Sequence, residues 1–250
     1  MSNSITPTKF DMSNLTMVDM SNLTMDELKK ICKERNIHGC SGKTKNKLID
    51  MIKQSYITTT LNINSVHCPN DIISGKLITK DKRHEIFGQV AGGSNSRSPE
   101  DYQRSKISEG TGIECKKTSM RINLRNNKLE NISHPNTQDN GFDYSEDFDG
   151  FQYFNNNHVY YNFKCIVGSG GSQTRSLREV YNFINGQLNV LKSEKNVYFA
   201  NILDGDESYN AMKHFNYLIS LTEYESVKNK LYVGDLKGYF DWFKNNFNSL

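Results

Sequence analysis

Apolar residues between positions 23 and 56 recur three or four apart in two short runs, which is the spacing of two amphipathic helices. Turn residues, HGCSG at 38–42, separate the two runs. Thr24 is followed three residues later by Glu27, an arrangement typical of a capping box at the start of a helix. We therefore predict a helix–turn–helix module over residues 23–56. The apolar positions that define it are Leu28, Ile31, Cys32, Leu48, Ile49 and Ile52.

The pattern changes after residue 139, where strand-like and helix-like segments follow one another. Residues 150–154 and 159–167 are typical of two strands joined by an Asn-rich hairpin turn. The continuing order of helix, strand, helix, strand and helix predicts an α/β domain over 139–250, with a mixed sheet flanked by helices. The later segments are a helix from about Thr174, a buried strand at 197–203, a helix at 208–221, a strand at 231–233 and a helix at 235–247.

The remaining segments are less regular. Residues 57–138 combine two strand-like stretches, ITTTLNINSV and MRINLRNNKLENI, with a short helical stretch, DKRHEIFGQVA, and a loop at 92–99, so we predict an α+β extension of the main domain. Residues 1–22 read as a flexible tail in which DMSNLTM occurs at 11–17 and again at 19–25. Only the second copy adjoins a helix, so we expect only that copy to be ordered.

Composition excludes several classes of protein. In 250 residues, 36% are hydrophobic and 24% are charged, which suits a folded chain. The sequence has neither a secretory signal pattern nor an apolar run of about 18 residues, so we expect an intracellular protein without a membrane partner. The five cysteines form no CxxC pair, and their spacing relative to the histidines fits no common zinc site.

Positive charge is concentrated in the N-terminal module. Eight basic and four acidic residues lie between Asp26 and Lys53, whereas the whole chain carries only +3. A basic helical hairpin favours a polyanion, because phosphate contacts release counterions. The alternative is a solvated lysine-rich face.

The segment LTMDELKKICKERNIHGCSGKTKNKLIDMI resembles the SAP family of two-helix DNA-binding modules. This resemblance implies binding of double-stranded DNA with little sequence specificity. The contacts that it implies, at the turn and the start of the second helix, are Ser41, Lys43, Lys45 and Lys47.

Asp149 and Lys164 lie on the two strands of the predicted hairpin, where they can converge at one sheet edge. A carboxylate can hold Mg²⁺, and a lysine can orient an attacking water and stabilise charge on a phosphate. Phosphodiester hydrolysis needs this combination. The alternative for Lys164 is an exposed strand lysine.

Asp149, the triplet Asn162-Phe163-Lys164 and the helix segment GGSQTRSLREVYNFI resemble the PD-(D/E)xK nuclease superfamily, which includes many restriction endonucleases. Asn162 stands where the superfamily usually has Asp or Glu. Some members carry that acid on the following helix, where this chain has Glu179. The resemblance therefore implies a Mg²⁺ site at Asp149 and Glu179, with Asn162 and Lys164 completing the catalytic set. The alternative for Glu179 is a helix capping box with Ser176.

Three polar residues near the start of that helix are candidate DNA contacts: Gln173, Arg175 and Arg178. Arginine suits phosphate or guanine, although pairing with Glu179 is the alternative. The aromatic residues of the closing helix, which recur at helical spacing, are expected in the core: Tyr239, Phe240, Trp242, Phe243 and Phe247.

Together these features predict a Mg²⁺-dependent DNA endonuclease that its SAP-like module tethers to duplex DNA. The first alternative is a non-enzymatic DNA-binding protein whose nuclease-like domain has lost its chemistry with the second acid. The second alternative is an RNA-binding or structural chromatin-type protein. The domain pair is similar to SAP-domain proteins of large DNA viruses such as iridoviruses, and a homodimer is one expectation, since cutting two strands needs two sites.

Overall fold

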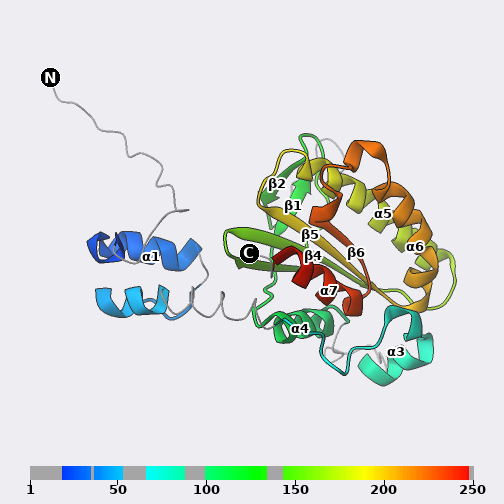
Figure 1. Cartoon of the computed structure of the whole chain (residues 1–250), viewed down its shortest axis with the longest axis horizontal. Helices are drawn as coiled ribbons and strands as arrows, with labels where there is room; N and C mark the ends of the chain where they lie inside the picture. Colours follow the sequence, from blue (N-terminus) through cyan, green and yellow to red (C-terminus); the bar gives the residue numbers. More distant parts are fainter. Residues whose placement is uncertain (1–18, 35–36, 53–65, 88–98, 134–142, 248–250) are drawn as a thin grey trace. The chain divides into compact units, whose positions relative to one another are not determined.

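The computed structural model describes residues 19–34, 37–52, 66–87, 99–133 and 143–247. The chain divides into two compact units, Met1–Thr60 and Leu61–Leu250 (Figure 1). Of the predicted extension (57–138), residues from Leu61 onward therefore share a unit with the α/β segments that follow them.

The first unit contains a 3-10 helix, Asp19–Asn22, the helix α1, Met25–Glu34, and helical residues 45–52. The sequence pattern places residues 19–22 in the flexible tail, but they form a 3-10 helix and the Met20 side chain is buried with the helices. Met20 belongs to the second DMSNLTM copy, the copy that was expected to be ordered. The first copy lies outside the described residues. The core of this unit consists of Met20, Leu23, Leu28, Ile31, Cys32, Leu48, Ile49 and Ile52.

The capping box at the start of α1 is confirmed. The Glu27 carboxylate accepts hydrogen bonds from the Thr24 backbone N–H at 2.7 Å and the Thr24 hydroxyl at 2.8 Å, and the Glu27 N–H donates to Thr24 Oγ1 at 3.3 Å. Gly39 and Gly42 have φ of 76° and 72°, a conformation that glycine adopts without steric cost. The predicted helix–turn–helix is therefore formed by local hydrogen bonds and two glycines.

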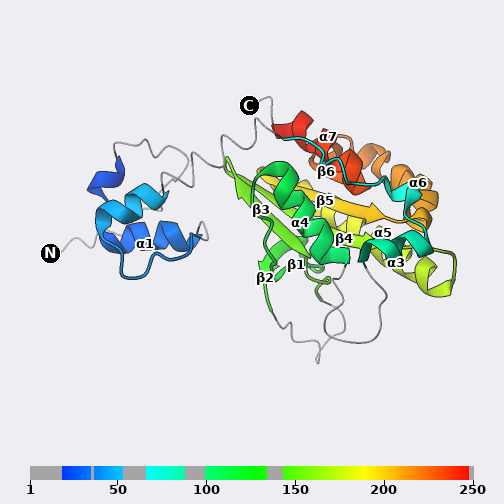
Figure 2. The same ribbon diagram turned by 90° about the horizontal axis from the view of Figure 1, so that it is seen from below.

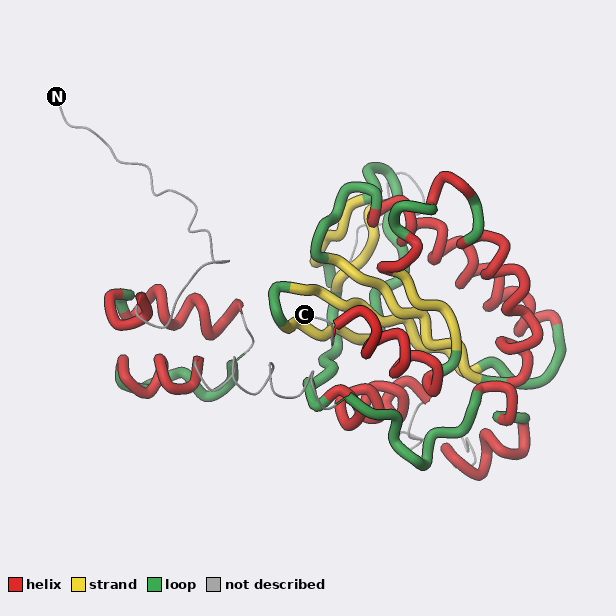
Figure 3. The backbone as a smooth tube through the Cα atoms, viewed as in Figure 1, coloured by secondary structure: helices red, strands yellow, loops and turns green. Residues whose placement is uncertain are grey.

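The second unit is built around a four-stranded sheet in the order β3-β4-β5-β6 (Figure 3). The pair β3–β4 is antiparallel, whereas β4–β5 and β5–β6 are parallel, so the predicted α/β class with a mixed sheet is confirmed. Asn155 and Asn156 both have positive φ, as a two-residue hairpin turn requires. The strands are β3 (Gly150–Phe154), β4 (Asn157–Cys165), β5 (Val197–Asp204) and β6 (Leu231–Gly234).

Helices cover both faces of this sheet (Figure 2). One face packs against α5 (Gly171–Leu191) and α6 (Asp206–Ile219). The other face packs against α4 (Pro99–Thr111) and α7 (Leu236–Phe247). The aromatic residues of α7 are in the core as predicted: Tyr239, Phe240, Phe243 and Phe247 are buried and Trp242 is half-buried.

The extension forms elements on both sides of the sheet. The predicted helical stretch is α3 (Lys80–Phe87), and the predicted strand-and-turn stretch is a separate hairpin of β1 (Met120–Asn123) and β2 (Lys128–Asn131). The helix α4 was not predicted, because much of its buried side is polar or small. Short 3-10 helices complete the unit at Gly75–Leu77, Thr222–Tyr224 and Lys228–Lys230. Within the described ranges, no helix is long and apolar enough to cross a membrane.

Candidate active site

A hollow of about 390 Å³ lies between α5, the end of β4 and the segment before β3. Lys164 and Asn162 of β4 contribute to it, because alternate residues of a strand point to the same face and this face is covered by α5. Glu179 lines it from α5, and Glu146 lines it from the acidic segment. The structure therefore gathers three of the four predicted catalytic residues around one hollow.

Asn162 is tied into a buried amide network beneath α5. Its Nδ2 donates to Asn201 Oδ1 of β5 at 3.1 Å, and Gln187 Nε2 donates to the same oxygen at 3.0 Å. Asn201 Nδ2 donates in turn to Gln187 Oε1 at 2.7 Å. An ionised carboxylate at position 162 could not donate a hydrogen bond to Asn201 Oδ1. An amide therefore suits this position better than an acid.

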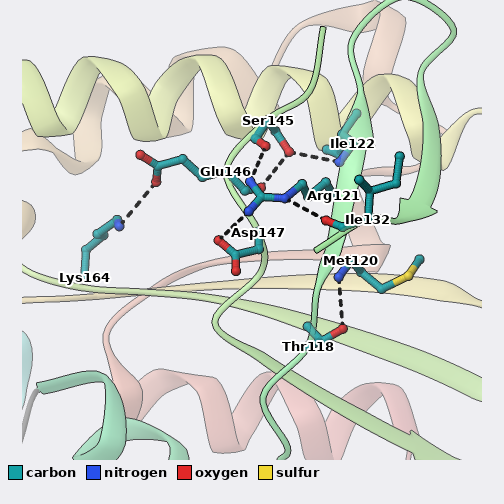
Figure 4. Close-up of polar contacts among 9 residues, drawn as sticks. All are labelled: Thr118, Met120, Arg121, Ile122, Ile132, Ser145, Glu146, Asp147 and Lys164. Carbon is teal, nitrogen blue, oxygen red and sulfur yellow. Dashed lines mark hydrogen bonds and ion pairs between the residues drawn. The ribbon is translucent and has the colours of Figure 1, made fainter. Parts of the chain in front are cut away.

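Lys164 is paired with an acid that the sequence motif does not include. Its Nζ lies 3.7 Å from Glu146 Oε2, and 30% of the lysine side chain is exposed to solvent. The two side chains point toward one another (Figure 4), and both residues line the hollow. Because the Glu146 side chain is exposed, Lys164 can exchange it for another anion at little cost, since ion pairs open to solvent contribute about 0–1 kcal/mol.

The segment that carries Glu146 is held against β1 (Figure 4). The Arg121 guanidinium donates to the carbonyl oxygens of Ile132 at 3.1 Å and Ser145 at 2.9 Å, and it lies 3.4 Å from Asp147 Oδ1. The Ile122 N–H donates to Ser145 Oγ at 2.9 Å. These contacts fix the backbone on both sides of Glu146.

Asp149 directly precedes β3, and its backbone N–H donates to the Tyr161 carbonyl of β4 at 2.8 Å. Its Oδ2 accepts the Phe163 N–H at 2.7 Å, a backbone group that a ladder carbonyl would otherwise satisfy. The Arg104 guanidinium of α4 donates to the Asp149 carbonyl oxygen at 2.8 and 3.1 Å. Asp149 does not line the hollow that holds Lys164 and Glu179.

Burial raises the pKa of the Asp149 carboxyl to about 6. The Phe163 N–H and the positive charge of Lys164 oppose this shift, whereas Glu100 and Asp147 add to it. The carboxylate is thus close enough to Lys164 to feel its charge, and it changes protonation near neutral pH. A cation bound beside it would hold it in the ionised form.

The helix α5 begins at Gly171, earlier than the predicted start at Thr174. Glu179 therefore lies in the third turn, where helix N–H groups are already paired, so the capping-box alternative with Ser176 is wrong. Its side chain is exposed at the rim of the hollow, next to Asn182. Among the described residues it forms no ion pair with an arginine of α5.

The predicted DNA contacts lie in two places. Ser41, Lys43 and Lys47 are exposed and Lys45 is half-buried at the turn and second helix of the first unit. Gln173 and Arg175 belong to the first turns of α5, where the Gln173 amide oxygen accepts a hydrogen bond from Ser172 Oγ at 2.8 Å. Arg178 precedes Glu179 by one residue, about 100° away around α5, and lines a second hollow, against α6.

Sequence reasoning missed several residues of the site. Asn182 and Ser145 line the first hollow, and Asn201 and Gln187 hold Asn162 from beneath. Glu146 and Asp147 are reserve candidates for the second acid, because they belong to an acidic run without a basic residue: Asp139, Asp143, Glu146, Asp147 and Asp149. In the part of the chain that the structure describes, no three His, Cys, Asp or Glu side chains are grouped closely enough to hold a metal ion.

Comparison with known proteins finds no matching family model, no matching curated protein and no matching solved structure. The class of the molecule therefore follows from its own architecture: a small helical unit joined to a mixed α/β unit.

Proposed function

We propose that this protein is a Mg²⁺-dependent DNA endonuclease with a restriction-endonuclease-like domain and a SAP-like DNA-binding unit. The observation that carries the proposal is the hollow that presents Lys164 together with Glu146 and Glu179, beside the partly buried Asp149. A cation and carboxylates around one opening suit a phosphodiester, because the lysine binds a phosphate oxygen and the acids hold a metal ion.

In this proposal each side chain has a separate role. Lys164 leaves Glu146 and donates to the phosphate or the attacking water. Asn162 orients that water from a rigid position, since its amide is held by Asn201. Asp149 and Glu179 supply carboxylate oxygens.

The donor set fits Mg²⁺, which commonly binds through one or two carboxylates and completes its shell with waters and substrate phosphates. Asp149 and Glu179 are the proposed ligands. Glu179 lines the hollow together with Glu146, whereas Asp149 lies outside its lining. When bound, the ion would supply a hydroxide-forming water and neutralise phosphate charge.

The first unit serves as the tether. Lys43 and Lys47 are exposed at its turn and second helix and form no ion pair with any residue that the structure describes. Their charge is therefore free for phosphates. Even weak binding by this unit raises the local concentration of DNA at the second unit.

Incubation of the protein with supercoiled plasmid in Mg²⁺, Mn²⁺ or EDTA tests the proposal. We expect metal-dependent nicking or cutting that Lys164→Ala abolishes while DNA binding is retained. Lys192→Ala is the matched control, because Lys192 is another partly exposed lysine paired with one glutamate, at the far end of α5. Cleavage by Lys164→Ala at the wild-type rate would rule out the proposed site.

A non-enzymatic DNA-binding protein is the second candidate. The observation that favours it is the Asn162 network, which uses a structural amide where the superfamily motif has a metal-binding acid. Plasmid that stays intact under every condition, with its mobility still shifted by the protein, would support this candidate. Mn²⁺ binding by calorimetry that disappears in Asp149→Ala would count against it.

A further inference from the structure

A second hollow of about 640 Å³ lies between α5 and α6, on the other side of α5 from the candidate active site. Residues 174, 177, 178 and 181 of α5 line it, whereas residues 179, 182, 183 and 186 line the first hollow. One helix therefore forms a wall of both hollows. A chain that crosses α5 near Arg178 and Glu179 can contact both.

The floor of this second hollow is apolar and aromatic. Phe215 and Ala211 of α6 are buried there, and Leu177 and Tyr181 of α5 are half-buried. Tyr217 at the edge is 64% exposed, and among the described Phe, Tyr and Trp residues only Tyr209 is exposed as well. An apolar floor with an available ring suits a flat, partly apolar group such as a nucleobase.

The rim of the hollow is cationic. Arg178 and Lys213 are exposed, and neither forms an ion pair with any residue in the described ranges. His214 lies beside Lys213, and Glu207 is the one acid among the lining residues. Several other basic residues of this unit have acid partners, as Arg121, Lys192 and Lys228 show, whereas Lys237 and Lys244 of α7 form no ion pair with any described residue. The unpaired charge favours a ligand with phosphate groups.

We propose that this hollow binds unpaired nucleotides of a single-stranded DNA segment. Bases lie against the exposed Tyr217 and the half-buried Tyr181, above the buried Phe215, and Arg178 and Lys213 bind the phosphates between them. The aromatic floor selects unpaired over duplex DNA, because bases inside a duplex cannot stack on a protein ring. The inference rests on the proposed action on DNA and adds a binding site to it.

The test uses the full chain and a fluorescein-labelled oligothymidylate of about 20 nucleotides, long enough to cover a single-strand site, followed by anisotropy over a range of salt. We expect Arg178→Ala/Lys213→Ala to weaken binding at least tenfold. We also expect the slope of log K against log salt to fall by about 1.4, since each lost single-strand phosphate contact removes about 0.7. Tyr217→Ala is expected to weaken binding about fivefold or more through lost stacking.

Lys237→Ala/Lys244→Ala is the matched control. Both lysines are exposed on α7, which packs on the opposite face of the sheet, so the variant removes the same charge away from the hollow. Equal losses in the two double variants, or unchanged binding in Tyr217→Ala, would overturn the proposal. An equal loss of duplex binding in Tyr217→Ala would overturn the choice of unpaired DNA.

The two proposals fail in different ways. Wild-type protein that neither binds nor cuts any DNA would refute the proposed function, and this inference with it. If the wild-type protein cuts plasmid and the Arg178→Ala/Lys213→Ala variant binds the oligonucleotide as well as the wild type does, the second site alone is refuted.

Discussion

Replacement of Asp149 by asparagine is expected to stabilise the second unit at alkaline pH. Burial raises the pKa of this carboxyl to about 6, from an ordinary value of 3.8. Between these two values the folded chain binds more protons than the unfolded chain, so stability falls as the pH rises through this window. The asparagine side chain carries no charge at any pH, and its carbonyl oxygen can still accept the Phe163 N–H.

The magnitude follows from the size of the shift. About two pKa units at about 1.4 kcal/mol each correspond to at most about 3 kcal/mol, reached in full above about pH 7 and absent below about pH 4. The stability gained by Asp149→Asn should therefore be larger at pH 8 than at pH 4 by up to about 3 kcal/mol. Asp204, whose pKa burial also raises, contributes equally to both proteins and cancels.

Urea unfolding followed by tryptophan fluorescence measures this difference, because Trp242 is the only tryptophan and lies on α7 of the second unit. Asp101→Asn is the control of opposite sign, since the hydrogen bond from Arg104 lowers the pKa of Asp101. That variant should lose stability relative to wild type as the pH rises. A stability difference for Asp149→Asn that is the same at pH 4 and pH 8 would refute the reasoning.

Three further predictions concern packing, capping and reactivity. Gly110→Ala should lower stability by about 1–3 kcal/mol in urea unfolding, because the new methyl group would overlap the Phe240 ring, whereas Gly171→Ala, with open space, should not. Thr24→Ala should reduce the thermal stability of the first unit by about 1 kcal/mol in circular dichroism, and an unchanged transition would mean that the capping box contributes nothing. Cys115, whose pKa burial raises to about 12, should react with iodoacetamide at pH 8 more slowly than the half-buried Cys40 in peptide mass spectrometry, and labelling as early as that of Cys40 would contradict its burial.

Local pattern was sufficient wherever the deciding interactions are local. The capping box at Thr24 joins residues three apart, and the Asn155-Asn156 turn needs only two residues that tolerate positive φ. The strands and helices after residue 150 were predictable for the same reason, since their apolar spacing reflects one buried face. The helix α4 was not predictable, because it buries the polar side chain of Gln103, which donates to Asp204 at 2.7 Å.

In the candidate site, too, the features that depend on local spacing were predictable and those that depend on tertiary contacts were not. Lys164 and Asn162 could be placed on one face of a strand from their spacing alone, because side chains alternate along a strand. The motif also indicated Asp149, directly before the neighbouring strand. The sequence could not indicate that the Asp149 carboxylate accepts the Phe163 N–H, in place of the backbone carbonyl that usually accepts it in a sheet.

What the sequence by itself determined is the two helices of the first unit, the strands and helices after residue 150, the basic character of the first unit and the polar face of β4. Only the tertiary structure decided which groups surround Lys164. The pairing with Glu146 depends on Arg121 holding a segment 24 residues away, and Asn162 depends on an amide 39 residues away. Such contacts are set by the order of strands and the packing of α5 on the sheet, and no periodicity within a single segment encodes them.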